Sequence, residues 1–226
     1  MNLYLNLLII CLTEKLLKES LNQDGHSVTG LGRDFSQPIN FDGVDVVIHL
    51  AGESIAEGRW TKEKKELIRT SRVNQTQQLS DQLANSKQKP SVFISASAVG
   101  FYGDCGSELL TEKSPAGKGF LPDISVDWEN ATLSANEAGI RTIQLRTGIV
   151  LSKKGGALKK MLPPFLLGGG GIIGSGKQYM SWISLDDMVG AIKFLISNHN
   201  LNGPFNLTAP TPVDNKDFTK ILGKVI

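Results

Sequence analysis

Cysteine, histidine and an excess of charge of one sign are all scarce in this chain of 226 residues. Two cysteines, Cys11 and Cys105, are too few for a disulfide framework and are typical of a reducing cytoplasm, where we expect the protein to reside. Three histidines without metal-ligand spacing exclude structural zinc, and we expect no metal site. Lys plus Arg is 24 and Asp plus Glu is 22, a net charge of +2, which argues against a dedicated nucleic-acid binder.

A long hydrophobic run is also missing. The most apolar stretch, residues 3–12, is only about half as long as the roughly twenty residues that a membrane-spanning helix needs. It has neither the basic start nor the small-residue end of a signal peptide. We therefore expect no membrane partner, and we interpret this stretch as a buried strand or the front of a helix.

The sequence instead alternates short apolar runs with amphipathic stretches. We predict strands at residues 26–31, 44–50, 91–95, 141–146 and 204–207. We predict helices at residues 13–21, 62–85, 123–138, 186–197 and 215–224. Because strands that alternate with helices form right-handed βαβ units, the pattern predicts an α/β fold with a parallel sheet and helices on both faces.

Small or polar residues follow the predicted strands. Ligands of an open parallel sheet bind beyond the carboxyl ends of its strands, so these residues are candidates for a binding site. They include Gly32, Arg33, Ala51, Gly52, Glu53, Ser97 and Gly148. Small residues also close tight turns between strands and helices, and that structural interpretation stays open.

Four segments resemble the extended short-chain dehydrogenases/reductases. Residues 44–52 (VDVVIHLAG) look like the signature of their fourth strand, and residues 93–104 (FISASAVGFYGD) like the next strand with its active-site serine loop. Residues 144–152 (QLRTGIVLS) and 174–187 (GSGKQYMSWISLDD) resemble later substrate-region motifs. From about Thr13 onward the chain is similar to the epimerase-like subgroup, often described as nucleoside-diphosphate-sugar epimerases or cell-division-inhibitor-like proteins.

This resemblance implies a Rossmann-type doubly wound parallel sheet with a small C-terminal substrate lobe. The implied organisation is a cofactor-binding core at 1–150, a substrate flap at 151–185, a helix and strand returning to the core at 186–208, and an incomplete lobe at 209–226. It also implies NADP or NAD as cofactor, a small anionic or sugar-nucleotide-like substrate, and a homodimer as one assembly.

The resemblance also assigns candidate site residues. The catalytic candidates are Ser97 and Tyr102. The cofactor candidates are Arg33, Leu50, Ala51, Gly52, Glu53, Arg72 and Ser95, and the substrate candidates are Arg59, Trp60, Arg146, Gln178 and Trp182. An arginine at position 33 suits the 2′-phosphate of NADP, and the alternative is a solvated surface side chain. We expect His49 to pack in the core rather than to catalyse.

Three departures from the family pattern bear on function. No glycine precedes Gly25, so the glycine-rich turn that brings backbone to the pyrophosphate is absent, and we expect weakened NADP binding. The residues before Thr13 also look too few for a strand, that loop and a helical turn. No tyrosine has a lysine four residues later; that pair would fall near Ile124 and Trp128, where the subgroup commonly has Trp-Glu. The chain stops at Ile226, before a further C-terminal segment of the subgroup.

Three functional interpretations follow, and the sequence leaves all of them open. The first is an NADP-dependent oxidoreductase or epimerase. The second is a cofactor-binding or regulatory protein with little turnover, because the Tyr-Lys pair is missing. The third is a non-functional fragment, because we expect both ends to be truncated.

Overall fold

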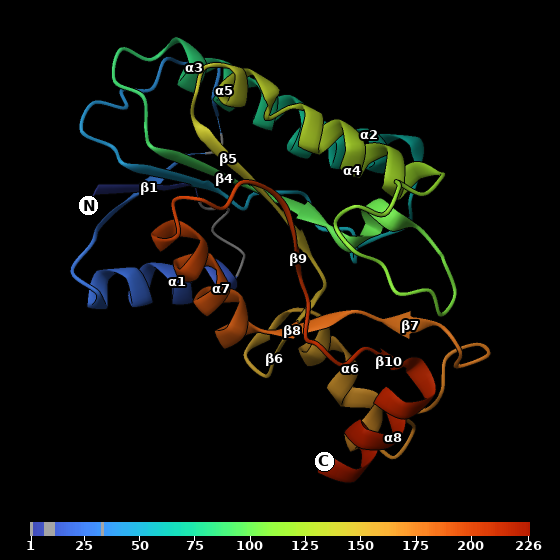
Figure 1. The fold of residues 1–226 in the computed structure, drawn as a ribbon. Coiled ribbons are helices and arrows are strands. Elements are labelled where there is room, and N and C mark those ends of the chain that lie inside the picture. Colours follow the sequence, from blue (N-terminus) through green and yellow to red (C-terminus); the bar gives the residue numbers. More distant parts are fainter. Residues whose placement is uncertain (1, 7–11, 33) are drawn as a thin grey trace.

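The computed structural model describes residues 2–6, 12–32 and 34–226, and six of the described strands form the main, parallel sheet (Figure 1). The strand order is β2-β1-β3-β4-β5-β9. The strands are β1 (Asn2–Asn6), β2 (Ser27–Leu31), β3 (Val46–His49), β4 (Val92–Ala98), β5 (Arg141–Thr147) and β9 (Gly203–Leu207). The chain runs from β1 outward to β2 and then returns across β1 to β3, which puts the topological switch point between β1 and β3.

Helices cover both faces of this sheet. On one face, α1 (Leu12–Gln23) and α7 (Leu185–Ser197) close a core with alternate strand residues, among them Ile48, Ile94 and Ile143. On the other face, α3 (Gln75–Asn85) and α5 (Leu133–Glu137) pack on Val47 and Phe93. Because successive side chains of a strand point to opposite faces, a strand between two helix layers must be apolar throughout. The predicted α/β fold with a parallel sheet is therefore confirmed.

The helices differ from the predicted ones at three places. The helix predicted at 123–138 is two helices, α4 (Phe120–Asn130) and α5, because the chain breaks at Ala131 and Thr132. The helix predicted at 62–85 contains a π-helical turn, Thr70–Asn74, between α2 (Lys62–Arg69) and α3. Helix α6 (Gly156–Leu166) was not predicted, since it contains two prolines. None of the described helices is long and apolar enough to cross a membrane.

The N-terminal segment contains both a strand and the start of a helix. Strand β1 pairs with β2 and β3, and α1 begins at Leu12. A strand and the start of a helix therefore do fit before and at Thr13, whereas the expectation that the glycine-rich loop does not fit between them stays a prediction. The connecting residues 7–11 lie outside the described part of the chain, and their sequence, LLIIC, contains no glycine.

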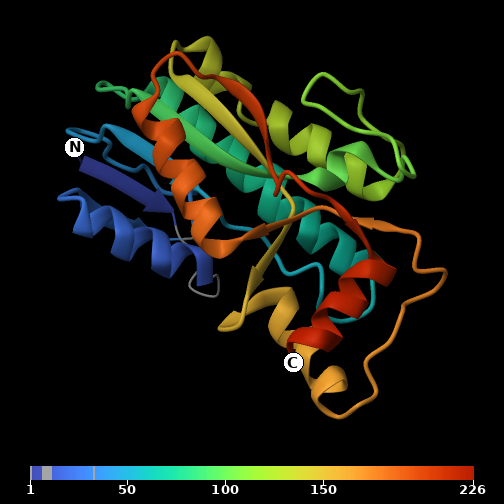
Figure 2. The same cartoon turned by 60° about the horizontal axis from the view of Figure 1, so that its bottom comes forward.

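A small lobe follows β5 and β9 and thus stands at the carboxyl end of the sheet (Figure 2). It contains α6, α8 (Asn215–Val225) and two small strand pairs. The pairs are β6 (Ile149–Ser152) with β8 (Trp182–Ser184), and β7 (Tyr179–Met180) with β10 (Val213–Asp214). Residues 151–180 and 209–226 contain eight lysines and two aspartates, whereas acidic residues outnumber basic ones in the remainder of the chain. The net charge of +2 is therefore the sum of a basic lobe and an acidic remainder of the chain.

Candidate functional site

Ser97, Arg146 and Asn206 are direct neighbours across three strands near their carboxyl ends. The strand register pairs Ser97 with Arg146 and Arg146 with Asn206. Paired residues of parallel strands point to the same face, and here that face also carries Phe93, four residues before Ser97. The face therefore changes from apolar to polar as it approaches the edge where ligands of such sheets bind.

Glu129 of α4 joins this row and completes a buried network. Its carboxylate accepts two parallel hydrogen bonds from Arg146, from Nε to Oε1 and from Nη2 to Oε2, both at 2.8 Å. The Ser97 hydroxyl donates to Oε1 at 2.7 Å. The Arg146 and Glu129 side chains are only 5% and 13% exposed. Burial alone would lower the pKa of Arg146, but hydrogen bonds to Glu129 and Tyr102 outweigh it and raise the pKa above its usual value.

Tyr102 is enclosed by the same network. It ends the 3₁₀ turn Val99–Tyr102 after β4, and its hydroxyl donates to Asn206 Oδ1 at 2.6 Å. The same hydroxyl accepts from Arg146 Nη1 at 3.0 Å, and the Arg146 guanidinium stacks on Phe101, 3.5 Å from the ring centroid. Because Tyr102 is buried and both of these bonds are internal, the geometry favours a positioning role. Its catalytic assignment stays a prediction.

Arg72 lies at the end of β3 in different surroundings. It belongs to the π-helical turn, and its Cζ would lie 3.2 Å from a Cβ placed on Gly52, so the guanidinium covers that glycine. It donates to the carbonyl oxygens of Glu53 at 2.9 Å and Ile68 at 3.3 Å, and it stands 5.1 Å from the Trp128 ring centroid.

The charge of Arg72 has no direct carboxylate partner in the described part of the chain. All of its hydrogen bonds there go to uncharged oxygens, the third being to Ser71 Oγ at 3.5 Å. The nearby Glu53 carboxylate instead pairs with Lys64 Nζ at 2.6 Å. Burial lowers the pKa of Arg72 to about 10, against the opposing effect of the Glu53 charge. Arg72 therefore offers a desolvated cation at the carboxyl edge of the sheet.

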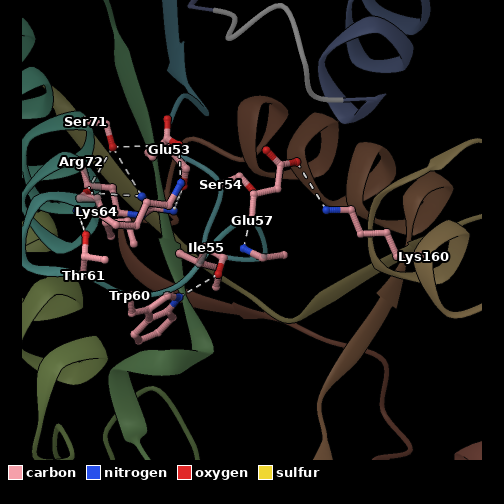
Figure 3. Close-up of polar contacts among 12 residues, drawn as sticks. Glu53, Ser54, Ile55, Glu57, Trp60, Thr61, Lys64, Ser71, Arg72 and Lys160 are labelled. Carbon is pink, nitrogen blue, oxygen red and sulfur yellow. Dashed lines mark hydrogen bonds and ion pairs between the residues drawn. The ribbon is translucent and has the colours of Figure 1, made fainter.

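Trp60 lies in the loop that follows β3 (Figure 3). Its indole N–H donates to the Ile55 carbonyl at 3.0 Å, and its ring meets Phe120 edge-on with the centroids 5.5 Å apart. In the same loop, Glu57 accepts a hydrogen bond from Lys160 of α6 at 3.4 Å. The loop thus joins the sheet to the basic lobe, and Trp60 is 39% exposed there. Arg59 beside it is also exposed.

Gln178 and Trp182 lie in the lobe itself. The Gln178 amide donates to the Ile173 carbonyl at 2.9 Å and so closes the glycine-rich loop on itself. The buried Asn215 side chain accepts from the Ile173 backbone amide at 2.8 Å, and the Asn215 backbone amide donates to the Gln178 carbonyl at 2.9 Å. The buried indole N–H of Trp182 has no hydrogen-bond partner among the described residues. Gln178 therefore shapes this loop, which leaves its assignment to substrate a prediction.

The structure gathers six of the predicted site residues into two groups. One is the network around Ser97, Tyr102 and Arg146, and the other surrounds Gly52, Glu53 and Arg72. Leu50 and Ala51 continue β3 toward the second group, and Ser95 lies in register with His49, on the face that carries the network. Arg33 lies outside the described residues.

Sequence reasoning missed Glu129 and Asn206. Glu129 did carry a signal, because the Trp-Glu pair stands where the superfamily has its lysine. Asn206 carried none, since its role depends on the pairing of β5 with β9. His49 is fully buried edge-on to Phe35, and burial lowers its pKa to about 4, as expected of a neutral core residue. The described residues contain no cluster of three or more His, Cys, Asp or Glu that could hold a metal ion.

A parallel sheet with this strand order and a switch point between β1 and β3 defines a protein of the Rossmann-type fold. A family model described as the NAD dependent epimerase/dehydratase family matches residues 15–207, and the chain belongs to that family.

The similar proteins are longer than this chain. An epimerase family protein of Mycobacterium bovis is 46% identical over 183 residues, which are 81% of this chain and 60% of that protein. A structure described as the nucleoside-diphosphate sugar epimerase of Corynebacterium glutamicum has 37% identity and a TM-score of 0.87, covering all of this chain and 50% of that one. The human epimerase family protein SDR39U1, solved with NADPH, has 27% identity and a TM-score of 0.90, covering 99% of this chain and 79% of that one. The chain thus spans about 60% of the length of its curated relatives.

Proposed function

We propose that the chain supplies the cofactor-binding part of an NADP-dependent oxidoreductase or epimerase for a small anionic substrate. The observation that carries this proposal is Arg72, a desolvated cation over Gly52 that has no direct carboxylate partner among the described residues. A phosphate provides both the opposite charge and the hydrogen-bond acceptors that a guanidinium matches best. The human relative described with NADPH supports the same cofactor.

We expect the cation near the end of β3 to receive a phosphate of the cofactor. Ala51 is buried and Arg72 covers Gly52, so the guanidinium is the group there that a phosphate would contact. The sequence of residues 7–11 does not match the glycine-rich turn of Rossmann-type proteins, because it contains none of the glycines that let backbone amides reach a pyrophosphate. We therefore expect millimolar affinity for NADP, or roughly −4 kcal/mol. When bound, the cofactor would accept or donate hydride, while these residues would bind and orient it.

The basic lobe supports an anionic substrate. Its eight lysines against two aspartates create a positive potential at the carboxyl end of the sheet. Lys160 of the lobe donates to Glu57 in the loop that carries Arg59 and Trp60, so this loop and the lobe are in contact. We propose Arg59 as a contact for a charged group of the substrate and the exposed ring of Trp60 as a contact for a sugar or another ring.

A cofactor-binding or regulatory protein with little turnover is the second candidate function. The enclosed hydroxyl of Tyr102 favours it, because that hydroxyl is held by Asn206 and Arg146 and no tyrosine has the usual lysine partner. The third interpretation, a non-functional fragment, predicts no nucleotide binding at all. A cytoplasmic location and a homodimer stay predictions.

Titration with NADPH and NADH separates these candidates. We expect millimolar NADPH binding by the chain and tighter binding once a glycine-rich turn is introduced before Thr13, with NADPH preferred. Arg33→Ala should then remove the preference for NADPH. Turnover by a binding-competent chain would favour the enzyme over the regulatory protein. Failure to bind either nucleotide even with the glycine turn would overturn the proposal, and a micromolar dissociation constant without it would show that other groups hold the cofactor.

A further inference from the structure

One helical segment engages every polar group of Glu53 (Figure 3). The Glu53 carboxylate accepts from Lys64 Nζ at 2.6 Å, its backbone amide donates to Ser71 Oγ at 2.9 Å, and its carbonyl accepts from Arg72 Nη2 at 2.9 Å. Lys64 belongs to α2, and Ser71 and Arg72 to the π-helical turn that continues it. The residue after Gly52 is thus fixed at three points.

The π-helical turn makes two of these contacts compatible. Adjacent residues of a regular helix point about 100° apart, yet Ser71 and Arg72 both reach Glu53. The Ser71 hydroxyl also donates to the Ile68 carbonyl at 3.1 Å, which leaves its oxygen oriented to accept from the Glu53 amide. Single π turns are frequent at functional sites, and this one contacts Glu53, one of the cofactor candidates after β3.

Lys64 has a separate consequence for Arg72. The negative charge of Glu53 is near enough to act on the Arg72 guanidinium, and a free Glu53 carboxylate would compete with a bound phosphate for it. Lys64 takes that carboxylate in an ion pair, and its own side chain is only 16% exposed. The pair leaves the Arg72 charge available to a ligand.

We propose that Ser71 and Lys64 are positioning residues of the cofactor site. Ser71 fixes the Gly52–Glu53 peptide against the helix, and Lys64 neutralises the carboxylate that would otherwise compensate Arg72. This inference rests on the proposed function, because the ligand whose affinity it explains is NADPH.

Ser71→Ala tests the first part, with NADPH as the probe in a titration followed by NMR chemical shifts. We expect the dissociation constant to rise about five- to tenfold, the loss of one ordered hydrogen bond. Ser71→Thr keeps the hydroxyl and should bind within about twofold of the unchanged chain. Thr70→Ala is the matched control, since the Thr70 hydroxyl bonds Glu66 at 3.2 Å on the exposed side of the helix. Equal affinities of Ser71→Ala and Thr70→Ala would overturn the role of Ser71.

Lys64→Met tests the second part, with Lys65→Met as a control of equal charge change. Lys65 lies over the Phe120 ring, 5.0 Å from its centroid, whereas Glu53 pairs with Lys64. We expect Lys64→Met to raise the dissociation constant about fivefold and Lys65→Met to change it less than twofold. Adding Glu53→Gln to Lys64→Met should restore the affinity, because the freed carboxylate is then absent. Equal effects of the two lysine variants, or no restoration, would overturn the role of Lys64.

The same titrations separate this inference from the proposed function. A folded chain that does not bind NADPH even with the glycine-rich turn introduced before Thr13 overturns the proposed function and this inference together. NADPH binding that is insensitive to both Ser71→Ala and Lys64→Met overturns only the inference. Dispersed amide spectra of each variant show that a change in affinity does not come from unfolding.

Discussion

Two arginines on the same side of the sheet illustrate opposite uses of a buried charge. Arg146 forms a bidentate ion pair with Glu129, and its hydrogen bonds raise its pKa. Arg72 donates only to uncharged oxygens in the described residues, and burial lowers its pKa to about 10. One guanidinium is balanced inside the protein and the other is not. We therefore propose that Arg146 serves mainly the scaffold and Arg72 a ligand, and the substrate contact predicted for Arg146 stays a prediction.

The energetic reason lies in desolvation. Removing a charge from water is unfavourable, and a buried partner with parallel hydrogen bonds offsets that loss for Arg146. No such partner offsets it for Arg72 in the described part of the chain, and groups with perturbed pKa values cluster at functional sites. An anion that binds there would supply the opposite charge that the described residues do not place directly against Arg72.

The largest effect on stability should follow the loss of Arg146. Arg146→Met leaves the buried Glu129 carboxylate unpaired, and we expect the free energy of unfolding in urea to fall by about 3–5 kcal/mol. Arg69→Met is the matched control, because Arg69 pairs with Asp127 at 2.6 Å with both side chains about 40% exposed. It should lose about 1 kcal/mol or less. Equal losses in the two variants would remove the contrast between a scaffold arginine and a surface one.

Measuring the free energy of unfolding at a series of pH values isolates the contribution of His49 from that of the Arg146 network. Burial lowers the pKa of His49 to about 4 in the folded chain, while an unfolded histidine titrates near 6.5. The neutral form is therefore favoured by folding, so the stabilisation is complete above pH 6.5 and is lost as the pH falls toward 4. The expected loss is roughly 3 kcal/mol. His49→Gln should flatten stability over this window, and an unchanged slope would contradict the assignment.

Tyr102→Phe should have an intermediate effect. It removes the bonds to Asn206 and Arg146 while keeping the ring, and we expect a loss of about 1–2 kcal/mol in urea unfolding. Any turnover should fall by less than the roughly 10²-fold expected for a positioned general acid. A loss near 10⁴-fold would instead show that Tyr102 is an activated catalytic group.

Arg72→Met should have the smallest effect on stability. The substitution removes hydrogen bonds to neutral oxygens but also removes an unbalanced, desolvated charge, and methionine keeps much of the volume. We expect the free energy of unfolding to change by about 1 kcal/mol or less. A loss as large as that of Arg146→Met would show that Arg72 also belongs to the scaffold.

The sequence predicted the sheet well because its central strands are locally unambiguous. Runs such as VVIH in β3 and VFIS in β4 can hardly be anything but strands buried on both faces. Helix α6 was missed because local rules penalise Pro163 and Pro164, although the helix tolerates them here. The break after α4 was missed because the apolar spacing continues across it.

The sequence predicted which residues belong to the candidate site, but not which other residues they bond to. Ser97, Tyr102, Arg146 and Arg72 were all singled out, yet their different electrostatic states depend on Glu129, Asn206 and Lys64. Glu129 comes from another layer of the fold, and Asn206 becomes a neighbour of Arg146 only through the register of β5 and β9. Such long-range pairings leave no local pattern. The single sequence therefore identifies candidate charges without showing which of them is balanced.

Comparison of NADPH binding by Arg72→Met and Arg69→Met tests the central claim most directly. Both variants lose one arginine from the same helical segment, but only Arg72 lies over Gly52. We predict that Arg72→Met weakens binding by roughly 10- to 100-fold, the worth of a charge-assisted hydrogen bond, while Arg69→Met changes it less than about twofold. Equal dissociation constants for the two variants would contradict the account, because they would show that the unbalanced charge of Arg72 does not meet the cofactor.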